Sequence, residues 1–229
     1  MLKIKVKDIT VDEIIKGKTY LGAGASKEAY GDENTVYKIP RGRYFIEEET
    51  WAQDLEYPTS IEEIDDFTEQ VYDLCPRMVW PLGQFAVEII VWQALLALEE
   101  DYGADISRFA RIKDYYLDKN GVIVIEQERT NIDYGNLPLE HREAEWEALD
   151  DDLTIINGML KENFGLAIVD IRRGNCGFSK EKTIKVFDFG LSNNDSIRNY
   201  CDYESYFDEE DEDWDSSCSS SYSDSTSST

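Results

Sequence analysis

The strongest constraint on the fold of this chain is an apolar stretch, Phe85–Leu98, that is interrupted only by Glu88 and Gln93. The stretch is shorter than the roughly 20 apolar residues that a membrane-spanning helix needs. We therefore expect a buried helix, around which the rest of the chain builds its layers. Glu88 is the only charged residue between Arg77 and Glu99, and a carboxylate in so apolar a helix needs a cationic partner.

Segments on both sides of this helix are typical of β-hairpins. Tyr20-Leu21 and Thr35–Ile39 flank a run of turn-forming residues. Further along, Phe109–Leu117 and Val122–Glu126 flank an Asn120-Gly121 step. Asn-Gly between two β-rich runs is a strong hairpin signal, because both residues tolerate the positive φ that a tight turn requires.

The remaining regular segments are mostly helical. Ile61–Leu74 and Leu139–Asn163 have helical patterns, and we expect an interruption of the second near Asp150–Asp152. Two short strand-like runs, Asn175–Phe178 and Thr183–Phe187, follow as a small hairpin. The order of these segments predicts an α+β protein with a sheet-rich N-terminal lobe and a helical C-terminal lobe.

Charge restricts the partners of this chain. Its 23 Lys and Arg against 49 Asp and Glu give a net charge of −26, which repels nucleic acids and anionic membranes. We expect neither as a partner, whereas a basic protein remains possible. The cysteines form no CxxC pair and are interpreted as free thiols of a reducing, cytoplasmic environment.

A separate segment follows residue 201. Residues 202–229 hold ten Asp or Glu, no Lys or Arg, and a Ser-rich end. Such a composition cannot bury enough apolar area to offset the entropy of ordering, so we expect an acidic, Ser-rich, disordered tail. Alternatively, the tail serves only to keep the protein soluble.

Two segments near the N-terminus suit phosphate binding. Gly22 and Gly24, separated by one residue, let backbone N–H groups approach phosphate oxygens. Lys38 lies in an otherwise apolar strand and is expected to point its ammonium inward. Each feature alone also fits a common structural role, a flexible turn for the glycines and a solvent-facing strand residue for Lys38.

Oxygen ligands for a hard cation come later in the chain. Asp170 and Asn175 are close in sequence, and Asp188 follows the second predicted hairpin within Asp188-Phe189-Gly190. Carboxylate and carboxamide oxygens brought together in this way suit Mg²⁺. Taken singly, each of these residues also fits a capping or turn role.

Four motifs thus follow one another in the chain: Gly22-x-Gly24, the Lys38 strand, Asp170 with Asn175, and Asp188-Phe189-Gly190. In this order they resemble the protein-kinase-like superfamily, in particular small serine/threonine kinase-like proteins of bacteriophages and other viruses. The resemblance covers roughly residues 15–195. It implies a bilobal kinase-like domain over residues 1–200. The antiparallel-sheet N-lobe spans about 1–128, with an acidic insertion at about 41–79, and a minimal helical C-lobe spans about 129–200. A viral chain of this kind would act in the host cytoplasm.

The resemblance also implies roles for residues in the N-lobe. Gly22 and Gly24 would cover the phosphates of ATP, and Lys38 would neutralise the α- and β-phosphates. Glu88 would pair with Lys38. The backbone of Glu126, Gln127 and Glu128 would form the linker that binds adenine.

Further roles fall in the C-lobe. Asp170 would be the catalytic base, and Asn175 and Asp188 would hold Mg²⁺. Arg172 lies where protein kinases often carry a lysine that contacts the γ-phosphate, and it would substitute for that lysine.

The chain departs from the family pattern in ways that concern the substrate more than the phosphates. Lys27 replaces the third glycine of the loop and would stiffen the lid or add a cation to it. Ile168-Val169 replaces the usual His-Arg before Asp170, so an activation-loop phosphate has no such arginine to bind. No Ala-Pro-Glu follows Gly190, and few residues remain for helices that bind a protein substrate.

These observations favour an ATP- and Mg²⁺-dependent phosphotransferase that acts on Ser or Thr of a protein. The alternative is a catalytically weak or inactive kinase-like protein that captures a basic partner protein. Autophosphorylation of the Ser-rich tail would combine an active site with an acidic segment. A small-molecule kinase is a further alternative, although Ile168-Val169-Asp170 lacks the His-Gly-Asp usual in those families.

Overall fold

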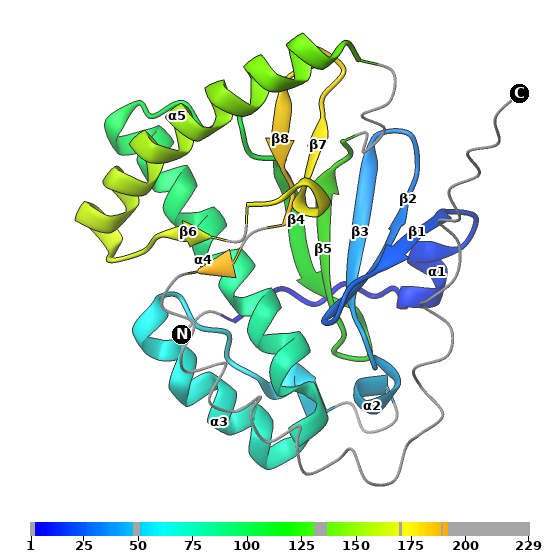
Figure 1. Cartoon of the computed structure of the whole chain (residues 1–229). Coiled ribbons are helices and arrows are strands. Elements are labelled where there is room, and N and C mark those ends of the chain that lie inside the picture. The colour runs from blue at the N-terminus through cyan, green and yellow to red at the C-terminus, as the bar shows by residue number, and fades with distance from the viewer. Residues whose placement is uncertain (1–2, 48–50, 131–136, 170, 189, 192–229) are drawn as a thin grey trace, which may run out of the picture.

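The computed structural model describes residues 3–47, 51–130, 137–169, 171–188 and 190–191, and these form an α+β protein around a five-stranded antiparallel sheet (Figure 1). Regions 131–136 and 192–229, which include the expected tail, lie outside the described residues. The helices are α1 Val11–Ile15, α2 Tyr44–Glu47, α3 Ile64–Leu74, α4 Val79–Tyr102 and α5 Leu139–Phe164. The strands are β1 Thr19–Ala23, β2 Lys27–Gly31, β3 Thr35–Pro40, β4 Ile112–Leu117, β5 Ile123–Glu128, β6 Ile168–Val169, β7 Cys176–Phe178, β8 Ile184–Val186 and β9 Gly190–Leu191.

The main sheet has the strand order β1-β2-β3-β5-β4. The hairpin predicted at Asn120-Gly121 is confirmed, since β4 and β5 pair in antiparallel register and Gly121 has φ +90°. Asp118 closes this turn, because its buried carboxylate accepts hydrogen bonds from the backbone N–H groups of Asn120 and Val122. The same carboxylate accepts from the N–H of Val11, which ties α1 to the turn.

The first hairpin differs from the expectation. Thr35–Pro40 forms β3 as expected, but its antiparallel partner is β2, a strand that the sequence pattern does not reveal. The run around Tyr20 is a third strand, β1, which pairs with β2. The glycine-containing segment therefore forms the β1–β2 turn rather than leading directly to the strand that carries Lys38.

The apolar stretch forms the core helix, as the sequence predicts. In α4, most side chains are buried, including Phe85, Leu95 and Leu98. The helix is long and apolar enough to cross a membrane, but 78% of its most apolar window is buried inside the protein, as in a core helix. It ends at Gly103, whose φ of +67° suits a left-handed C-terminal cap.

Part of the segment expected as an acidic insertion covers α4. Its helix α3 packs against α4 (Figure 1) and buries Ile64, Phe67 and Val71. The exposed side of α3 carries acidic residues, for example Asp65 and Asp66. The segment is thus an integral layer of the fold, with an apolar face inward and acids outward.

The predicted interruption of the last helix is wrong. Helix α5 is continuous through Asp150–Asp152. The buried residues Leu149, Leu153, Ile156 and Leu160 recur at helical spacing, and their burial outweighs the low helix propensity of three aspartates. Asp152 also binds the guanidinium of Arg108 (Nε–Oδ2 2.7 Å).

Two small two-stranded sheets complete the fold. The expected hairpin is confirmed as β7 and β8. The segment before β4 joins β8 by a parallel bridge, in which the N–H of Ala110 donates to Val186 O and the N–H of Val186 donates to Arg108 O. Strand β6 pairs with β9. Backbone hydrogen bonds therefore hold the segment around β7 and β8 against the main sheet.

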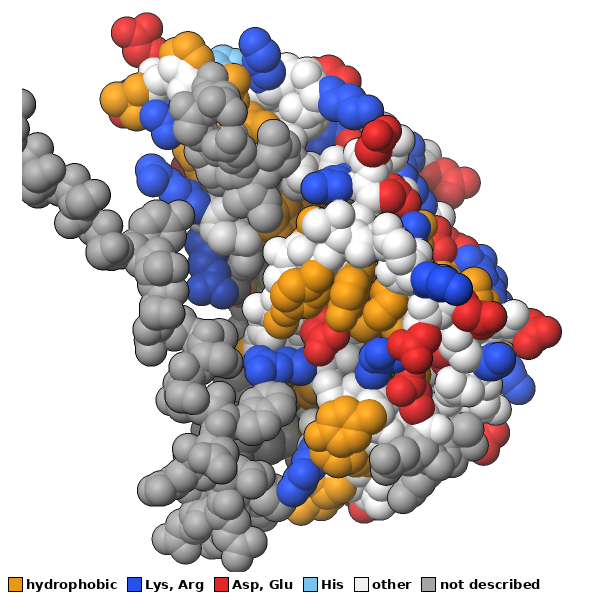
Figure 2. Space-filling model, turned by 90° about the vertical axis from the view of Figure 1, so that its right-hand side faces the viewer, with side chains coloured by type: hydrophobic (Ala, Val, Ile, Leu, Met, Phe, Trp, Pro, Cys, Tyr) orange, Lys and Arg blue, Asp and Glu red, His pale blue; other side chains and the backbone are white. Residues whose placement is uncertain are grey.

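One face of the main sheet carries a row of tyrosines. Tyr20, Tyr30 and Tyr37 are direct cross-strand neighbours on β1, β2 and β3. Because side chains alternate along a strand, Lys38 points to the opposite face. Figure 2 shows the side of the molecule formed by β1 and β2, where hydrophobic, basic and acidic side chains are mixed. The acidity of the chain is therefore not uniform over its surface.

The contact between α5 and β8 gives a pH-dependent prediction. Glu145 accepts from Arg108 (2.7 Å) and from the N–H of Ile184 (3.0 Å). Partial burial opposes the charged form, but these bonds outweigh it and hold the pKa of Glu145 below its ordinary value of 4.5. Stability from a lowered carboxylate pKa is present above the unfolded-state value and disappears as the pH falls through the folded-state value.

We expect Glu145→Gln to reduce the free energy of unfolding by about 1–2 kcal/mol at pH 7. The difference from wild type should shrink as the pH falls below 4.5. Urea unfolding between pH 7 and about pH 3.5 measures this, with Glu147→Gln on the exposed side of the same helix as the control. A difference that stays constant over the whole range would contradict the assignment.

Candidate functional site

The candidate site is centred on Glu88, which is 0% exposed in the middle of α4. Lys38 Nζ donates to its Oε1, and Lys27 Nζ donates to its Oε2 (2.6 Å). Each carboxylate oxygen thus has its own ammonium partner. The pairing of Glu88 with Lys38 follows the sequence expectation, whereas the second lysine was not expected here.

Strand register explains why both lysines reach one carboxylate. In the β2–β3 pair, Lys27 is opposite Pro40, and Lys38 is opposite Ala29. Residues 27 and 29 of β2 share a face with residues 38 and 40 of β3, because side chains repeat every second residue. Lys27 and Lys38 are therefore diagonal neighbours on the face that packs against α4.

Two further contacts bring the segment after β8 into the cluster. Lys38 Nζ donates to the carbonyl oxygen of Phe187 (2.5 Å), and Lys27 Nζ donates to Asp188 Oδ1 (2.8 Å). Four groups from β2, β3, α4 and the segment after β8 thus meet: Lys27, Lys38, Glu88 and Asp188. We call these four residues the lysine–carboxylate cluster.

The charges of the cluster balance, and this balance sets its protonation. Burial opposes the charged form of Asp188, but the ammonium groups of Lys27 and Lys38 outweigh it and lower the pKa of Asp188 to about 2. Burial also opposes the charge on Lys27, but Glu88 and Asp188 outweigh it and raise the pKa of Lys27. Lys27 and Asp188 are therefore both charged at neutral pH.

The glycine pair lies directly before Lys27. The N–H of Gly24 donates to Lys27 O (2.8 Å), which closes the β1–β2 turn. Gly22 has φ +145°, a conformation that residues with a side chain rarely adopt. No atom lies within 4 Å of a Cβ built on Gly22 or Gly24. The turn thus leaves open space beside its backbone, as a phosphate-binding turn requires.

Asn175 and Asp188 have the chemistry for a hard cation. The backbone oxygen of Asn175 accepts from the N–H groups of Phe187 (2.9 Å) and Asp188 (3.4 Å), so the two predicted ligands are held together through the main chain. Asn175 is 8% exposed, and the side chain of Asp188 is 40% exposed. No group of three His, Cys, Asp or Glu side chains suited to a metal occurs within the described residues. One carboxylate and one carboxamide nevertheless fit Mg²⁺, which usually takes few protein ligands and keeps waters and phosphate oxygens.

The predicted catalytic base, Asp170, lies outside the described residues. The strand before it is well held, because the side chain of Asn157 on α5 accepts from Ile168 N (2.8 Å) and donates to Ile168 O (3.1 Å). Arg172 is exposed, and its charge is among those that lower the pKa of Asp188. Arg172 therefore lies near enough to Asp188 for their charges to interact.

The adenine-binding linker predicted at Glu126, Gln127 and Glu128 is misplaced. All three residues lie inside β5, between β3 and β4, where Glu126 pairs with Tyr37 and Glu128 pairs with Thr35. Their backbone groups are used by the sheet. Gln127 is buried and donates to Ala110 O (3.0 Å), and Glu128 binds Lys185 (2.8 Å). A linker between sheet and helices can begin only after Glu128.

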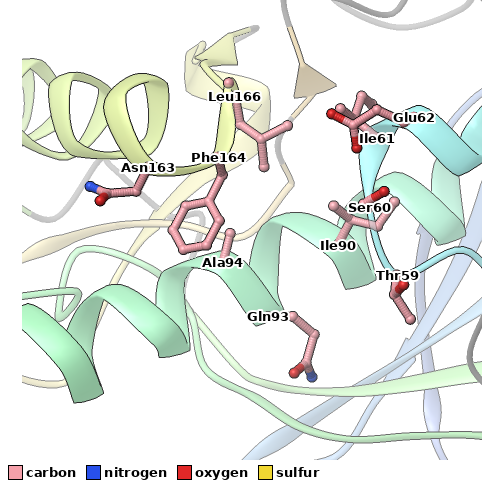
Figure 3. Close-up of a pocket in the computed structure, with 11 residues that line it drawn as sticks. Thr59, Ser60, Ile61, Glu62, Ile90, Gln93, Ala94, Asn163, Phe164 and Leu166 are labelled. Carbon is pink, nitrogen blue, oxygen red and sulfur yellow. The ribbon is translucent and has the colours of Figure 1, made fainter.

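A separate pocket of about 490 Å³ lies on the other side of α4. It is bounded by residues 59–62, by the end of α5 around Phe164, and by Ile90, Gln93 and Ala94 of α4 (Figure 3). These α4 residues follow Glu88 by two, five and six positions, which places them roughly 140° to 240° around the helix from Glu88. The pocket is therefore distinct from the lysine–carboxylate cluster.

The sequence alone did not identify the role of Lys27. Its place at the third glycine position of the family pattern is visible in the sequence. Because no local pattern predicts β2, the face on which Lys27 lies does not follow from the sequence. The available signal is the alternation of side chains between the two faces of a strand. Lys27 and Ala29 alternate with outward residues in the same way as Lys38 does on β3.

Removal of the central carboxylate tests the cluster. Glu88→Gln leaves two buried ammonium groups facing a neutral amide, and we expect the free energy of unfolding to fall by about 3–5 kcal/mol. Glu99→Gln is the matched control on the same helix, because Glu99 forms an exposed ion pair with Arg111 and should cost less than about 1 kcal/mol. Chemical denaturation measures both. Equal, small losses in the two variants would contradict the central role of Glu88.

Comparison with known proteins adds no family assignment. No protein-family model matches the chain, and no curated protein matches it. Its function must therefore be inferred from the groups that the fold brings together, which are two buried lysines, two carboxylates, a carboxamide and a glycine turn.

Proposed function

We propose that this protein is an ATP- and Mg²⁺-dependent phosphotransferase with a bilobal, protein-kinase-like fold. The observation that carries the proposal is the ion pair between Lys38 of β3 and buried Glu88 of α4. Lys27, which follows the β1–β2 turn, links this pair to Asp188. The main sheet with α4 would be the N-lobe, and α5 with β6 to β9 would be the C-lobe.

Lys38 would bind the α- and β-phosphates of ATP. Its ammonium is held by Glu88 and by the carbonyl oxygen of Phe187, so its position is fixed before the nucleotide arrives. Such preorganised charge lowers the barrier to phosphoryl transfer, because little reorganisation is needed in the transition state. Gly22 and Gly24 would leave room for the phosphates, because open space lies where each would carry a Cβ.

Asn175 and Asp188 would hold Mg²⁺. Bound there, the cation would neutralise charge on the transferred phosphate and help to align it. The lowered pKa of Asp188 keeps this ligand ionised well below neutral pH. Asp170 would accept the proton of the attacking hydroxyl, and Arg172 would bind the γ-phosphate.

The proposed acceptor is a Ser or Thr hydroxyl of a protein. The Ser-rich segment 202–229 is the first candidate, because it belongs to the same chain and is rich in hydroxyl groups. A phosphate on this segment would add roughly −1.5 to −2 charges and so increase its affinity for basic partners.

A second candidate function is capture of a basic protein without catalysis. The outward face of α3 favours it, because Asp65, Asp66, Glu69 and Asp73 are all exposed there. Such binding needs none of the phosphate-site groups. It should survive Lys38→Met and Asp188→Asn, whereas phosphate transfer should not.

Intact-mass spectrometry after incubation with ATP and Mg²⁺ tests phosphate transfer. We expect phosphate on wild type, and an initial rate reduced at least about 100-fold in Lys38→Met and Asp188→Asn. Lys16→Met, an exposed lysine outside the cluster, is the control and should behave as wild type. Equal incorporation in wild type and Asp188→Asn would contradict the proposal.

Deletion of residues 202–229 locates the acceptor. If the Ser-rich segment is the acceptor, the truncated chain should lose most incorporated phosphate but still transfer phosphate to the separate segment added as a peptide. Peptide mapping of both products measures this. Phosphate that remains on the truncated chain at the wild-type level would show that the acceptor lies elsewhere.

A further inference from the structure

The positive charge of Lys27 is not needed to neutralise Glu88. Glu88 and Lys38 already form a neutral buried pair, and Lys27 adds a second ammonium that is itself 8% exposed. An extra buried cation is costly unless another anion faces it. The anion is Asp188, whose Oδ1 lies 2.8 Å from Lys27 Nζ.

The carboxylate that Lys27 contacts here belongs to Asp188, which is a proposed metal ligand. A divalent cation at Asp188 and an ammonium on Oδ1 of the same carboxylate would repel each other at short range. The side chain of Asp188 is 40% exposed, whereas Glu88 is fully buried. Of the two carboxylates that Lys27 contacts, Asp188 is therefore the one that an incoming cation can reach.

Lys27 is also well placed to move. It is the first residue of β2 and follows the turn that begins at Gly24, beside which there is open space. The four-carbon stem of a lysine has several rotatable bonds, and its ammonium acts as a point charge without a preferred plane. A change in side-chain torsions can shift the ammonium from Asp188 towards the space beside the turn without moving the strand.

We propose that Lys27 is a second phosphate-binding lysine. Without ligand, its ammonium binds the carboxylate of Asp188. When a divalent cation binds Asp188 instead, the ammonium of Lys27 transfers to the triphosphate. This inference rests on the proposed function, since it assumes that phosphates bind below the glycine turn. Lys27 would keep the metal ligand paired in the empty site and add positive charge to the filled one. Lys38 remains on Glu88 throughout, so Glu88 keeps a partner when Lys27 leaves.

Lys27→Met tests the proposal through two effects of opposite sign. Without nucleotide, loss of the competing ammonium should tighten Mn²⁺ binding about tenfold. The Asp188-dependent part of that binding is isolated by subtracting Asp188→Asn in titrations followed by electron paramagnetic resonance. At a Mg²⁺ concentration that saturates the Asp188 site in both proteins, loss of a phosphate contact should weaken ATP binding about tenfold in calorimetry and leave adenosine binding unchanged.

Matched variants separate these effects from damage to the fold. Lys27→Arg keeps the cation and should lie close to wild type in both titrations. Lys16→Met applies the same chemical change at an exposed site and should change neither. Thermal unfolding of each variant verifies that it is folded. A merely structural defect would weaken both Mn²⁺ and ATP binding, which is not the expected pattern.

The outcomes distinguish this inference from the proposed function. Tighter Mn²⁺ binding together with weaker ATP binding in Lys27→Met supports it, and the absence of either shift overturns it. If Lys38→Met loses ATP binding while Lys27→Met retains it, the proposed function stands and only the role of Lys27 fails. If wild type and Lys38→Met bind ATP equally or not at all, the proposed function fails and this inference fails with it.

Discussion

The burial of Glu88 in the core is the constraint on which the rest of the structure depends. A fully buried carboxylate is tolerated only with charged or hydrogen-bonding partners, and here Lys27 and Lys38 each bind one of its oxygens. These bonds fix the face that α4 turns towards the sheet. They also fix the register in which β2 and β3 present their lysines. The apolar residues of α4 supply the driving force for burial, and Glu88 makes one orientation of the helix uniquely favourable.

Under the proposed function, the same ion pairs would prepare the site for ligands. Lys38 is bound on two sides and stays in place, whereas Lys27 bridges a buried carboxylate and a half-exposed one. A site with balanced charges is stable when empty, yet a cation and a polyphosphate can enter together without leaving an unpaired buried charge. Stability and the proposed ligand binding would thus depend on the same four residues, and one substitution in the cluster should change both.

The sequence predicts those parts of the molecule that follow from strong local or compositional signals. The Asn120-Gly121 hairpin and the buried helix follow from turn chemistry and apolar length. The isolation of Glu88 in that helix, together with the family resemblance, indicates its pairing with Lys38. The failures arise where tertiary pairing overrides local pattern. Strand β2 is stabilised by neighbours on both sides, and β5 extends to Glu128 because Thr35 pairs with it. Buried leucines hold α5 together across three aspartates.

A crystal structure with Mg²⁺ and a non-hydrolysable ATP analogue is the most direct test of the central claim, that the lysine–carboxylate cluster is a nucleotide-phosphate site. The account predicts phosphates below the Gly22–Gly24 turn, Lys38 still bound to Glu88, and Lys27 Nζ on a phosphate oxygen instead of Asp188. An analogue bound elsewhere, for example in the pocket beside Ile90, with the cluster unchanged, would contradict it.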